Sequence, residues 1–282
     1  MKTDFGGRKL STSGVATRRI VAYAINDVLE GAPIVKTSAR SFIDALYSEK
    51  PLLHHGETEL SRPIDPSETS LSPAQWNAIA NRDMCHGIGI DLAEFLFRTV
   101  SNGWHTLETG AGLSTLIFLE RGAWHVAITP NEDESVRIKQ YAAEHNVEIS
   151  RLTFVPLASE NYLPTARYEN LDCVLIDGKH AFPWPILDWF FTAAMLRRGG
   201  LLILDDIDLW PVRVLADFLA SEKPRWTCVQ QFDRSICFEK RTESVHDVTW
   251  HMQPLLSQEQ QRYTIRRITT AIKRRLLSAF SR

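Results

Sequence analysis

Three aspartates in the second half of the chain are the residues best placed to do chemistry. Asp177 ends the apolar run "VLID", and Asp205 and Asp206 end the run "LLILDD" one helical segment later. The carboxyl ends of neighbouring parallel strands meet at one edge of a sheet, so we expect the three carboxylates to converge. Crowded carboxylates repel one another, and a divalent cation relieves the repulsion. Their oxygen ligands suit Mg²⁺, so the sequence predicts a metal site at these aspartates.

A second interpretation stays open, in which the aspartates only cap the helices that follow the strands. His180 favours a catalytic role because it follows Asp177 by three residues, just beyond the strand. An imidazole accepts a proton near neutral pH, and a metal-bound hydroxyl group loses its proton more easily. The pattern predicts that His180 is a general base for a substrate hydroxyl. Asp188, on the intervening helical segment, is expected to face solvent.

A glycine-rich turn, "LETGAGLST", precedes these residues in the chain. Gly110 and Gly112 follow a strand-like run, and glycine allows a close approach of backbone and ligand. Ser114 can begin a helix with free N–H groups. Glu108 would repel a pyrophosphate, and Thr115 replaces the third glycine of the dinucleotide fingerprint. The turn therefore predicts a nucleoside site; a nicotinamide dehydrogenase stays open on the glycines alone.

The elements that must position these residues form a regular series. Strand-like runs alternate with helical patterns from "HTLET" to "LLILDD", which indicates a parallel sheet covered on both faces. The last two runs, "WTCVQQF" and "SICFEK", flank the short loop "DR" and predict an antiparallel hairpin. The predicted fold class is α/β, a doubly wound, mostly parallel seven-stranded sheet that ends in an antiparallel hairpin.

Three regions are expected along the chain. Residues 1–70 form an N-terminal extension, with a helix at "RRIVAYAINDVLE" and then a Pro- and Ser-rich linker. Residues 71–245 form the domain with the sheet, opening with a helix at "SPAQWNAIANRDM". Residues 246–282 form a C-terminal basic helical tail.

The tail, "QRYTIRRITTAIKRRLLSAFSR", contains seven basic residues and no acidic one, and its large apolar residues fall on one helical stripe. A basic amphipathic helix can lie on an anionic membrane or dock on a partner. The other interpretation is a terminal helix packed on its own domain or on a second subunit, since most apolar stripes belong to a core.

The composition limits the class of protein. With 44% hydrophobic and 23% charged residues, the chain can bury a core, and its net charge of −2 argues against a dedicated nucleic-acid binder. Its four cysteines lack metal-binding spacing, and we find neither a signal peptide nor a membrane-spanning apolar run. These features predict a cytoplasmic protein with reduced thiols, at most peripheral to a membrane.

The turn "LETGAGLST" resembles the first motif of class I S-adenosylmethionine (SAM) methyltransferases, and the predicted sheet with its final hairpin is similar to theirs. The resemblance covers a little over half of the chain. It implies SAM as the cofactor, with Glu108 near the methionine amino group. The implied contacts are Glu108, Gly110, Ala111, Gly112, Ser114, Thr115, Thr129, Ser159, Glu160 and Asp177.

Particular segments refine this resemblance. "PLASENYLP" resembles the adenine-contacting segment of catechol O-methyltransferases, which implies that Ser159 and Glu160 lie beside the base. That branch has a lysine in place of His180 and an asparagine in place of Asp206, whereas the metal-dependent macrolide-sugar enzymes have a histidine. The family usually holds the ribose with an acidic residue where this chain has Thr129.

The leading hypothesis is a Mg²⁺-assisted, SAM-dependent O-methyltransferase that acts on a hydroxyl of a sugar or small secondary metabolite. One alternative is a metal-independent methyltransferase whose aspartates only shape the pocket. Another is a non-catalytic scaffold protein of the same fold, suggested by Thr129 and the basic tail. The expected partners are the small acceptor and no nucleic acid, with a membrane or a second copy of the chain for the tail.

Overall fold

The computed structural model describes residues 39–49, 53–55, 83–85, 87–244 and 248–280, all within one compact unit, Thr37–Arg282. The expected helix "RRIVAYAINDVLE" and most of the linker after it lie outside the described residues. So does most of the expected helix "SPAQWNAIANRDM". Its last two residues instead belong to a short strand, β2 (Asp83–Cys85), which pairs antiparallel with β1 (Leu53–His55).

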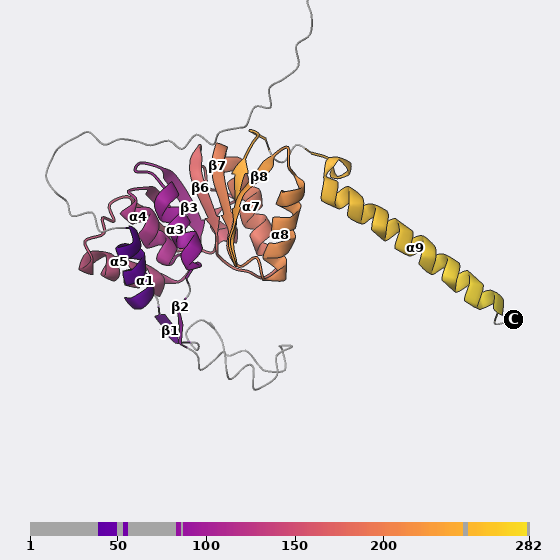
Figure 1. Ribbon diagram of the computed structural model, residues 1–282, viewed down its shortest axis with the longest axis horizontal. Helices are drawn as coiled ribbons and strands as arrows, with labels where there is room; N and C mark the ends of the chain where they lie inside the picture. Colours follow the sequence, from indigo (N-terminus) through magenta and orange to yellow (C-terminus); the bar gives the residue numbers. More distant parts are fainter. Residues whose placement is uncertain (1–38, 50–52, 56–82, 86, 245–247, 281–282) are drawn as a thin grey trace, which may run out of the picture. The chain divides into compact units, whose positions relative to one another are not determined.

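A seven-stranded sheet is the centre of the unit (Figure 1). The strand order is β5-β4-β3-β6-β7-β9-β8. The pairs from β5 to β7 are parallel, and β9 is antiparallel to both β7 and β8. This confirms the predicted α/β fold with its terminal hairpin. The strands are β3 (His105–Thr109), β4 (Trp124–Ile128), β5 (Leu152–Val155), β6 (Leu171–Ile176), β7 (Leu196–Leu204), β8 (Trp226–Gln231) and β9 (Ile236–Lys240).

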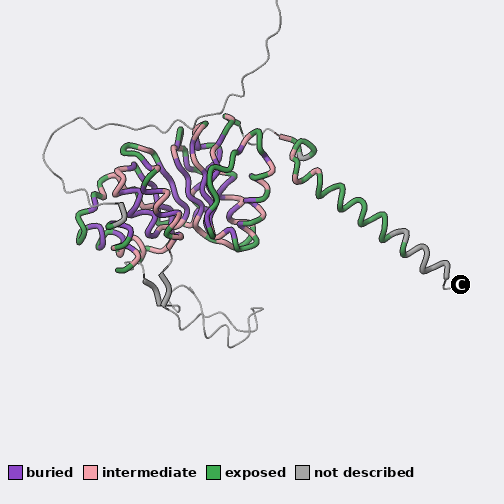
Figure 2. The backbone as a smooth tube through the Cα atoms, viewed as in Figure 1, coloured by how far each residue is buried: buried purple, intermediate pink, exposed green. Residues whose placement is uncertain are grey.

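Helices cover both faces of the sheet, and each face has its own apolar core. Side chains alternate along β6, so that Cys173 and Leu175 pack into one core while Val174 and Ile176 pack into the other. The strands are therefore apolar on both sides, which is why they form the buried centre of the molecule in Figure 2. The helices are α1 (Ala39–Glu49), α3 (Ile90–Thr99), α4 (Leu113–Glu120), α5 (Glu132–Glu144), α6 (Ser159–Tyr162), α7 (Trp184–Met195), α8 (Trp210–Ser221), η2 (Trp250–Met252) and α9 (Pro254–Phe280).

Two of the longer helices, α1 and α8, were not expected from the sequence. Phe42, Ile43 and Leu46 of α1 belong to the core that α3 and α4 share, so this part of the predicted N-terminal extension packs with the sheet. Leu215 and Leu219 of α8 belong to the opposite core. None of the described helices is both long enough and apolar enough to cross a membrane.

Candidate active site

The carboxyl ends of four neighbouring strands are tied together by backbone hydrogen bonds. The amide of Gly110 donates to Ile128 at 2.8 Å, and that of Asp177 donates to Thr109 at 3.1 Å. The amide of Asp205 donates to Ile176, also at 3.1 Å. The glycine turn and the aspartates therefore start from adjacent positions on one edge of the sheet, as the sequence predicts.

At this edge Asp177, His180 and Asp206 form a cluster, here called the rim cluster. His180 Nε2 lies 3.6 Å from Asp177 Oδ1 and 3.2 Å from Asp206 Oδ2, and all three side chains are partly exposed. One ligand atom from each residue falls within 4.8 Å of the others. Asp206 has φ of +54°, a left-handed conformation that costs an L-residue about 1–3 kcal/mol and is typical of functional sites.

Asp205 is separated from the rim cluster, although the sequence interpretation grouped it with Asp177 and Asp206. Its side chain is buried, accepts a hydrogen bond from the Ser235 hydroxyl and lies 3.7 Å from the guanidinium of Arg234. Arg234 lies near both aspartates, but only Asp206 also lies close to His180. The cluster at this edge therefore contains His180 together with two of the three predicted aspartates.

The pKa values of two residues of the rim cluster, Asp177 and His180, and of the neighbouring Asp205 are shifted from their ordinary values. Burial, with a smaller contribution from the Asp206 carboxylate, raises the pKa of Asp177 to about 6. Burial raises the pKa of Asp205 to about 7, and Asp177 adds to the shift. Burial acts to lower the pKa of His180, but the surrounding carboxylates outweigh it and raise that pKa. An imidazolium at His180 is thus stabilised by its neighbours.

The donor set fits a divalent cation. It offers two carboxylates and one imidazole, and His180 Nε2 makes no hydrogen bond within the part of the chain that the structure describes. Arg234, in the loop between β8 and β9, places its guanidinium 3.3 Å from Asp206 Oδ1 and already offsets part of the negative charge. A cation at the rim cluster would share Asp206 with Arg234. Through Nε2, His180 could serve as a metal ligand or as a base, but not as both.

Position 110 requires a glycine because of its backbone conformation and its close packing. Its φ is +95°, and a Cβ at this position would lie 2.3 Å from the carbonyl oxygen of Asp177. The glycine therefore lets the turn pack directly against the end of β6. Gly112 precedes α4, its amide donates to Thr115 Oγ1 at 3.0 Å, and Ala111 packs against the core.

Glu108 lies beneath the turn and is only 1% exposed. Its carboxylate accepts hydrogen bonds from Ser114 at 2.6 Å and from the hydroxyl of Thr115, and it lies 3.0 Å from His125 Nε2. His125 Nδ1 lies 2.8 Å from the Thr106 hydroxyl. We call these five residues the buried network. Three side chains predicted to contact the cofactor are therefore bonded to one another, and they fix α4 on the sheet.

Thr129 has an acidic neighbour that the sequence interpretation did not identify. Its hydroxyl donates to Glu134 Oε2 at 2.7 Å and accepts from the Asn131 amide at 3.1 Å. A carboxylate is thus present beside the end of β4, supplied by the first turn of α5. A cavity of about 350 Å³ opens there, lined by Thr129, Asn131, Val136, Lys139, Phe154 and Pro156, among others.

Ser159 and Glu160 begin α6 and flank the same edge. Glu160 lies 3.5 Å from Lys179 Nζ, which in turn lies 4.1 Å from the ring centre of Trp184. This ion pair links α6 to the loop that carries the rim cluster. Ser159 is buried and faces α7.

Asp188 of α7 was expected to face solvent, and that expectation is wrong: it is 1% exposed. The residues next to it on α7 are mostly apolar, and both carboxylate oxygens lack a hydrogen bond of good geometry among the described residues. Burial raises its pKa to about 6, while the nearby hydroxyls of Ser159 and Thr109 act in the opposite direction. The sequence did contain a signal for this burial, because Asp188 is the only acidic residue in a helix that is apolar on all sides, and such a helix is buried in the fold.

Residues 107–207, just over a third of the chain, match a family model described as a methyltransferase domain. The matched segment begins within β3 and ends just beyond β7. Every candidate site residue named from the sequence lies within this segment. A search of curated proteins finds no match.

Several solved structures share the fold at low identity. An O-methyltransferase from Bacillus cereus in complex with SAH is 18% identical, with 66% of this chain and 94% of that chain covered and a TM-score of 0.47. The cofactor-bound protein Rv0187 from MTB is also 18% identical, with 63% and 94% covered and a TM-score of 0.48. An rRNA methylase from Streptococcus thermophilus is 16% identical, with 56% and 99% covered and a TM-score of 0.43.

Proposed function

We propose that the chain is a SAM-dependent O-methyltransferase that acts on a hydroxyl of a sugar or small secondary metabolite with the assistance of Mg²⁺. The observation that carries the proposal is the rim cluster, Asp177, His180 and Asp206, at the edge of a methyltransferase domain beside its glycine turn. A base among carboxylates suits deprotonation of a hydroxyl acceptor.

The surroundings of the turn fit a nucleoside cofactor. Gly110 brings the backbone of the turn against Asp177, and the buried network holds the start of α4 in place. The cavity beside Thr129 offers an apolar wall at Phe154 and polar groups at Asn131 and Glu132. SAM, when bound, supplies an electrophilic methyl group. The Asp188 carboxylate, which lacks a hydrogen-bonding partner in the described chain, is available to a donor on the ligand.

The protein's own part in the reaction is to hold and deprotonate the acceptor. His180 Nε2 accepts the hydroxyl proton, and the carboxylates of Asp177 and Asp206 stabilise the resulting imidazolium. Orientation of the oxygen toward the methyl group supplies much of the remaining acceleration. Asp177 and Asp206 would hold Mg²⁺, which lowers the pKa of a bound hydroxyl.

Arg234 favours a second candidate, a metal-independent methyltransferase. Its guanidinium already lies 3.3 Å from Asp206, so part of the charge balance that a metal would provide is present in the chain. The scaffold alternative loses much of its motive, because Glu134 places a carboxylate where Thr129 had suggested a missing one. The free thiols of Cys173, Cys228 and Cys237 support a cytoplasmic location.

The experiment is methyl transfer from labelled SAM to a panel of hydroxylated sugars and phenols, together with amines and thiols, with Mg²⁺ and with a chelator. Product that forms only with Mg²⁺ supports the proposal, and equal product in the chelator supports the metal-independent candidate. Transfer to nitrogen or sulfur acceptors alone would contradict O-methylation.

A further inference from the structure

We infer that α9 is a surface-binding helix that docks the protein on an anionic lipid membrane. This inference concerns a part of the chain outside the methyltransferase domain and does not depend on the proposed reaction. It rests on the exposure of the helix, on the pattern of its apolar residues and on its charge.

The helix is exposed over most of its described length. Every side chain from Gln258 to Thr270 is exposed, and Tyr263, Ile265 and Ile268 are 57%, 61% and 54% exposed (Figure 2). Among the side chains of α9 that the structure describes, Leu255 and Ser257 in the first turn are half-buried. Those from Gln258 to Thr270 do not pack on the domain of the same chain, and a second subunit stays open as the alternative.

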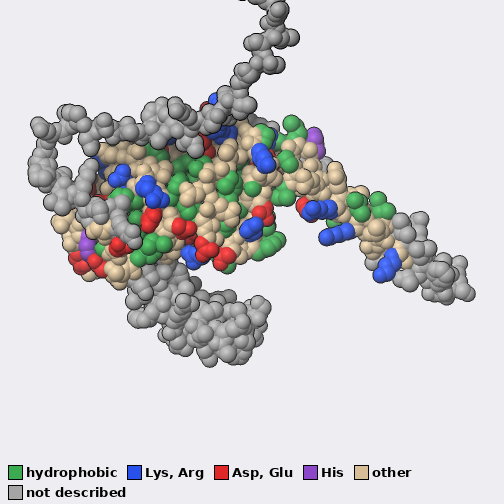
Figure 3. All heavy atoms as spheres, in the orientation of Figure 1, with side chains coloured by type: hydrophobic (Ala, Val, Ile, Leu, Met, Phe, Trp, Pro, Cys, Tyr) green, Lys and Arg blue, Asp and Glu red, His purple; other side chains and the backbone are tan. Residues whose placement is uncertain are grey.

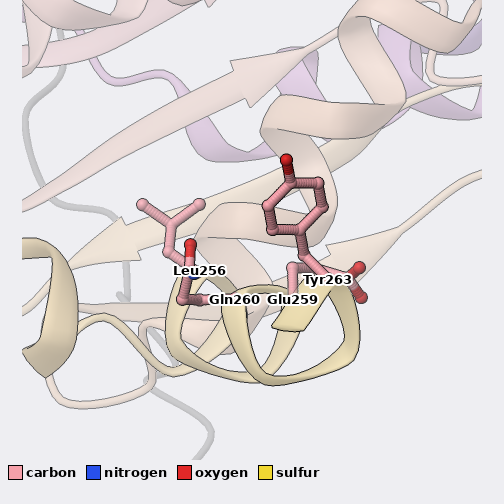
Figure 4. A pocket seen from close by; sticks show the side chains of 4 residues that line it. All are labelled: Leu256, Glu259, Gln260 and Tyr263. Atoms are coloured by element: carbon pink, nitrogen blue, oxygen red, sulfur yellow. The ribbon is translucent and has the colours of Figure 1, made fainter. Parts of the chain in front are cut away.

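The apolar residues follow the helical repeat. Ile265 and Ile268 are three residues apart and lie on one side of the helix, and the sequence continues the spacing with isoleucine at position 272 and leucine at 276. Nearer the start of α9, Leu256 and Tyr263 border a shallow hollow together with Glu259 and Gln260 (Figure 4). The helical repeat places these two residues on the other side of the helix, so they do not belong to the isoleucine stripe. An exposed apolar stripe of this kind marks a binding surface.

The charge of the helix identifies the chemistry of the surface it binds. Between Pro254 and Phe280 the sequence has six basic residues and one acidic residue, a formal charge of +5, in a chain whose net charge is −2. The acidic residue, Glu259, already pairs with Arg262. Arg266 and Arg267 form no ion pair within the part of the chain that the structure describes, and Figure 3 shows basic side chains along α9 beside apolar ones.

Anionic lipid is the surface that complements both features at once. Headgroup phosphates pair with the arginines while the acyl boundary accepts the isoleucine stripe. A second copy of the helix would bring two charges of +5 together, and the single acidic residue of each copy, Glu259, already pairs with its own Arg262. Nucleic acid would pair with the arginines but would leave the apolar stripe in water.

The test is co-sedimentation of the full chain with vesicles of phosphatidylcholine, alone or mixed with equal parts of phosphatidylglycerol. We expect binding to the anionic vesicles to be at least about tenfold tighter and to weaken as salt is raised. The variant Arg266→Glu with Arg267→Glu should lose this binding. Ile265→Ser with Ile268→Ser should weaken it without changing the charge.

The matched control is Arg198→Glu with Lys223→Glu, two exposed residues outside α9 that give the same change in net charge. This control should bind like the unmodified chain. Equal binding to both kinds of vesicle, or equal loss in the control and the α9 variants, would overturn the inference. So would absence of vesicle binding together with concentration-dependent dimers in sedimentation equilibrium, or with RNA binding that the α9 variants abolish.

Discussion

Two histidine–carboxylate groups lie in the same domain, and they differ in how their hydrogen bonds are met. In the buried network, Glu108 is surrounded by Ser114, Thr115 and His125, all with low exposure. In the rim cluster, His180 Nε2 lies between two carboxylates without a hydrogen bond among the described residues. A polar group whose hydrogen bonds are all made within the protein stabilises the fold, whereas one that lacks a hydrogen bond is available to a ligand.

The glycine turn lies between the two groups. Glu108 accepts hydrogen bonds from Ser114 and Thr115 at the start of α4, and Gly110 packs against the backbone of Asp177. Mutations should therefore separate the groups: changes to the rim cluster should reduce turnover and leave folding intact, and changes to the buried network should do the reverse.

The largest expected effect is a loss of turnover when residues of the rim cluster are substituted. Asp177→Asn and His180→Ala should each lower the rate of methyl transfer by about 10²–10⁴-fold, because the hydroxyl loses its base or the group that stabilises it. Asp177→Asn should not lower the free energy of unfolding, because burial disfavours the charge of this carboxylate and raises its pKa to about 6. Initial rates and urea unfolding measure the two quantities.

Asp217→Asn, an exposed change on α8, is the control for charge loss and should keep the full rate. Normal turnover in His180→Ala would remove His180 as the base.

The next effect in size concerns Asp188. Its pKa of about 6 lies above the value of about 3.9 in an unfolded chain, so the folded state binds this proton more tightly. The associated stability is complete below about pH 4 and is lost as pH rises through about 6, a difference of about 2–3 kcal/mol. Asp188→Asn should therefore be more stable than the unmodified chain at pH 8 and equal to it at pH 4. Chemical denaturation at the two pH values measures this.

If Asp188 also binds a cofactor donor, the same variant should bind S-adenosylhomocysteine more weakly while being more stable. Unchanged affinity would restrict Asp188 to a role in packing.

A smaller effect is expected in the buried network. His125→Phe keeps an aromatic ring against Phe118 but leaves the buried Thr106 hydroxyl without its partner and removes one of the three side chains around Glu108. Unfolding should become easier by about 1–3 kcal/mol, the cost of an unsatisfied buried polar group. The rate per folded molecule should stay the same. His105→Phe, at an exposed histidine of β3, should change neither quantity.

The smallest effect concerns charge balance at the rim. Arg234→Gln removes a cation 3.3 Å from Asp206, so Mg²⁺ should bind about tenfold more tightly, equivalent to about 1.4 kcal/mol. Calorimetric titration with Mg²⁺ measures this change. Weaker binding in the variant would mean that Arg234 holds Asp206 in place rather than competing with the metal.

The fold could be predicted from local patterns because continuous apolar strands, helical spacing and a two-residue hairpin loop are all encoded in short segments. The rim cluster could be predicted because it follows from strand ends in one parallel sheet. Contacts between side chains that are far apart in the sequence could not be predicted in this way. His125 meets Glu108 only because β3 and β4 are neighbours, and Arg234 reaches Asp206 only because β9 pairs with β7.

One error had a signal in the sequence. Asp188 lies within a helix that is apolar all round, which indicates burial rather than exposure.

The central claim is that a nucleoside cofactor binds beside the open rim cluster and not through the buried network. Calorimetric titration of S-adenosylhomocysteine into the full chain, with Mg²⁺ and then with a chelator, tests it most directly. We predict micromolar binding in both conditions, retained in His180→Ala. Absence of binding in both conditions would contradict the claim and would leave a methyltransferase fold without its cofactor.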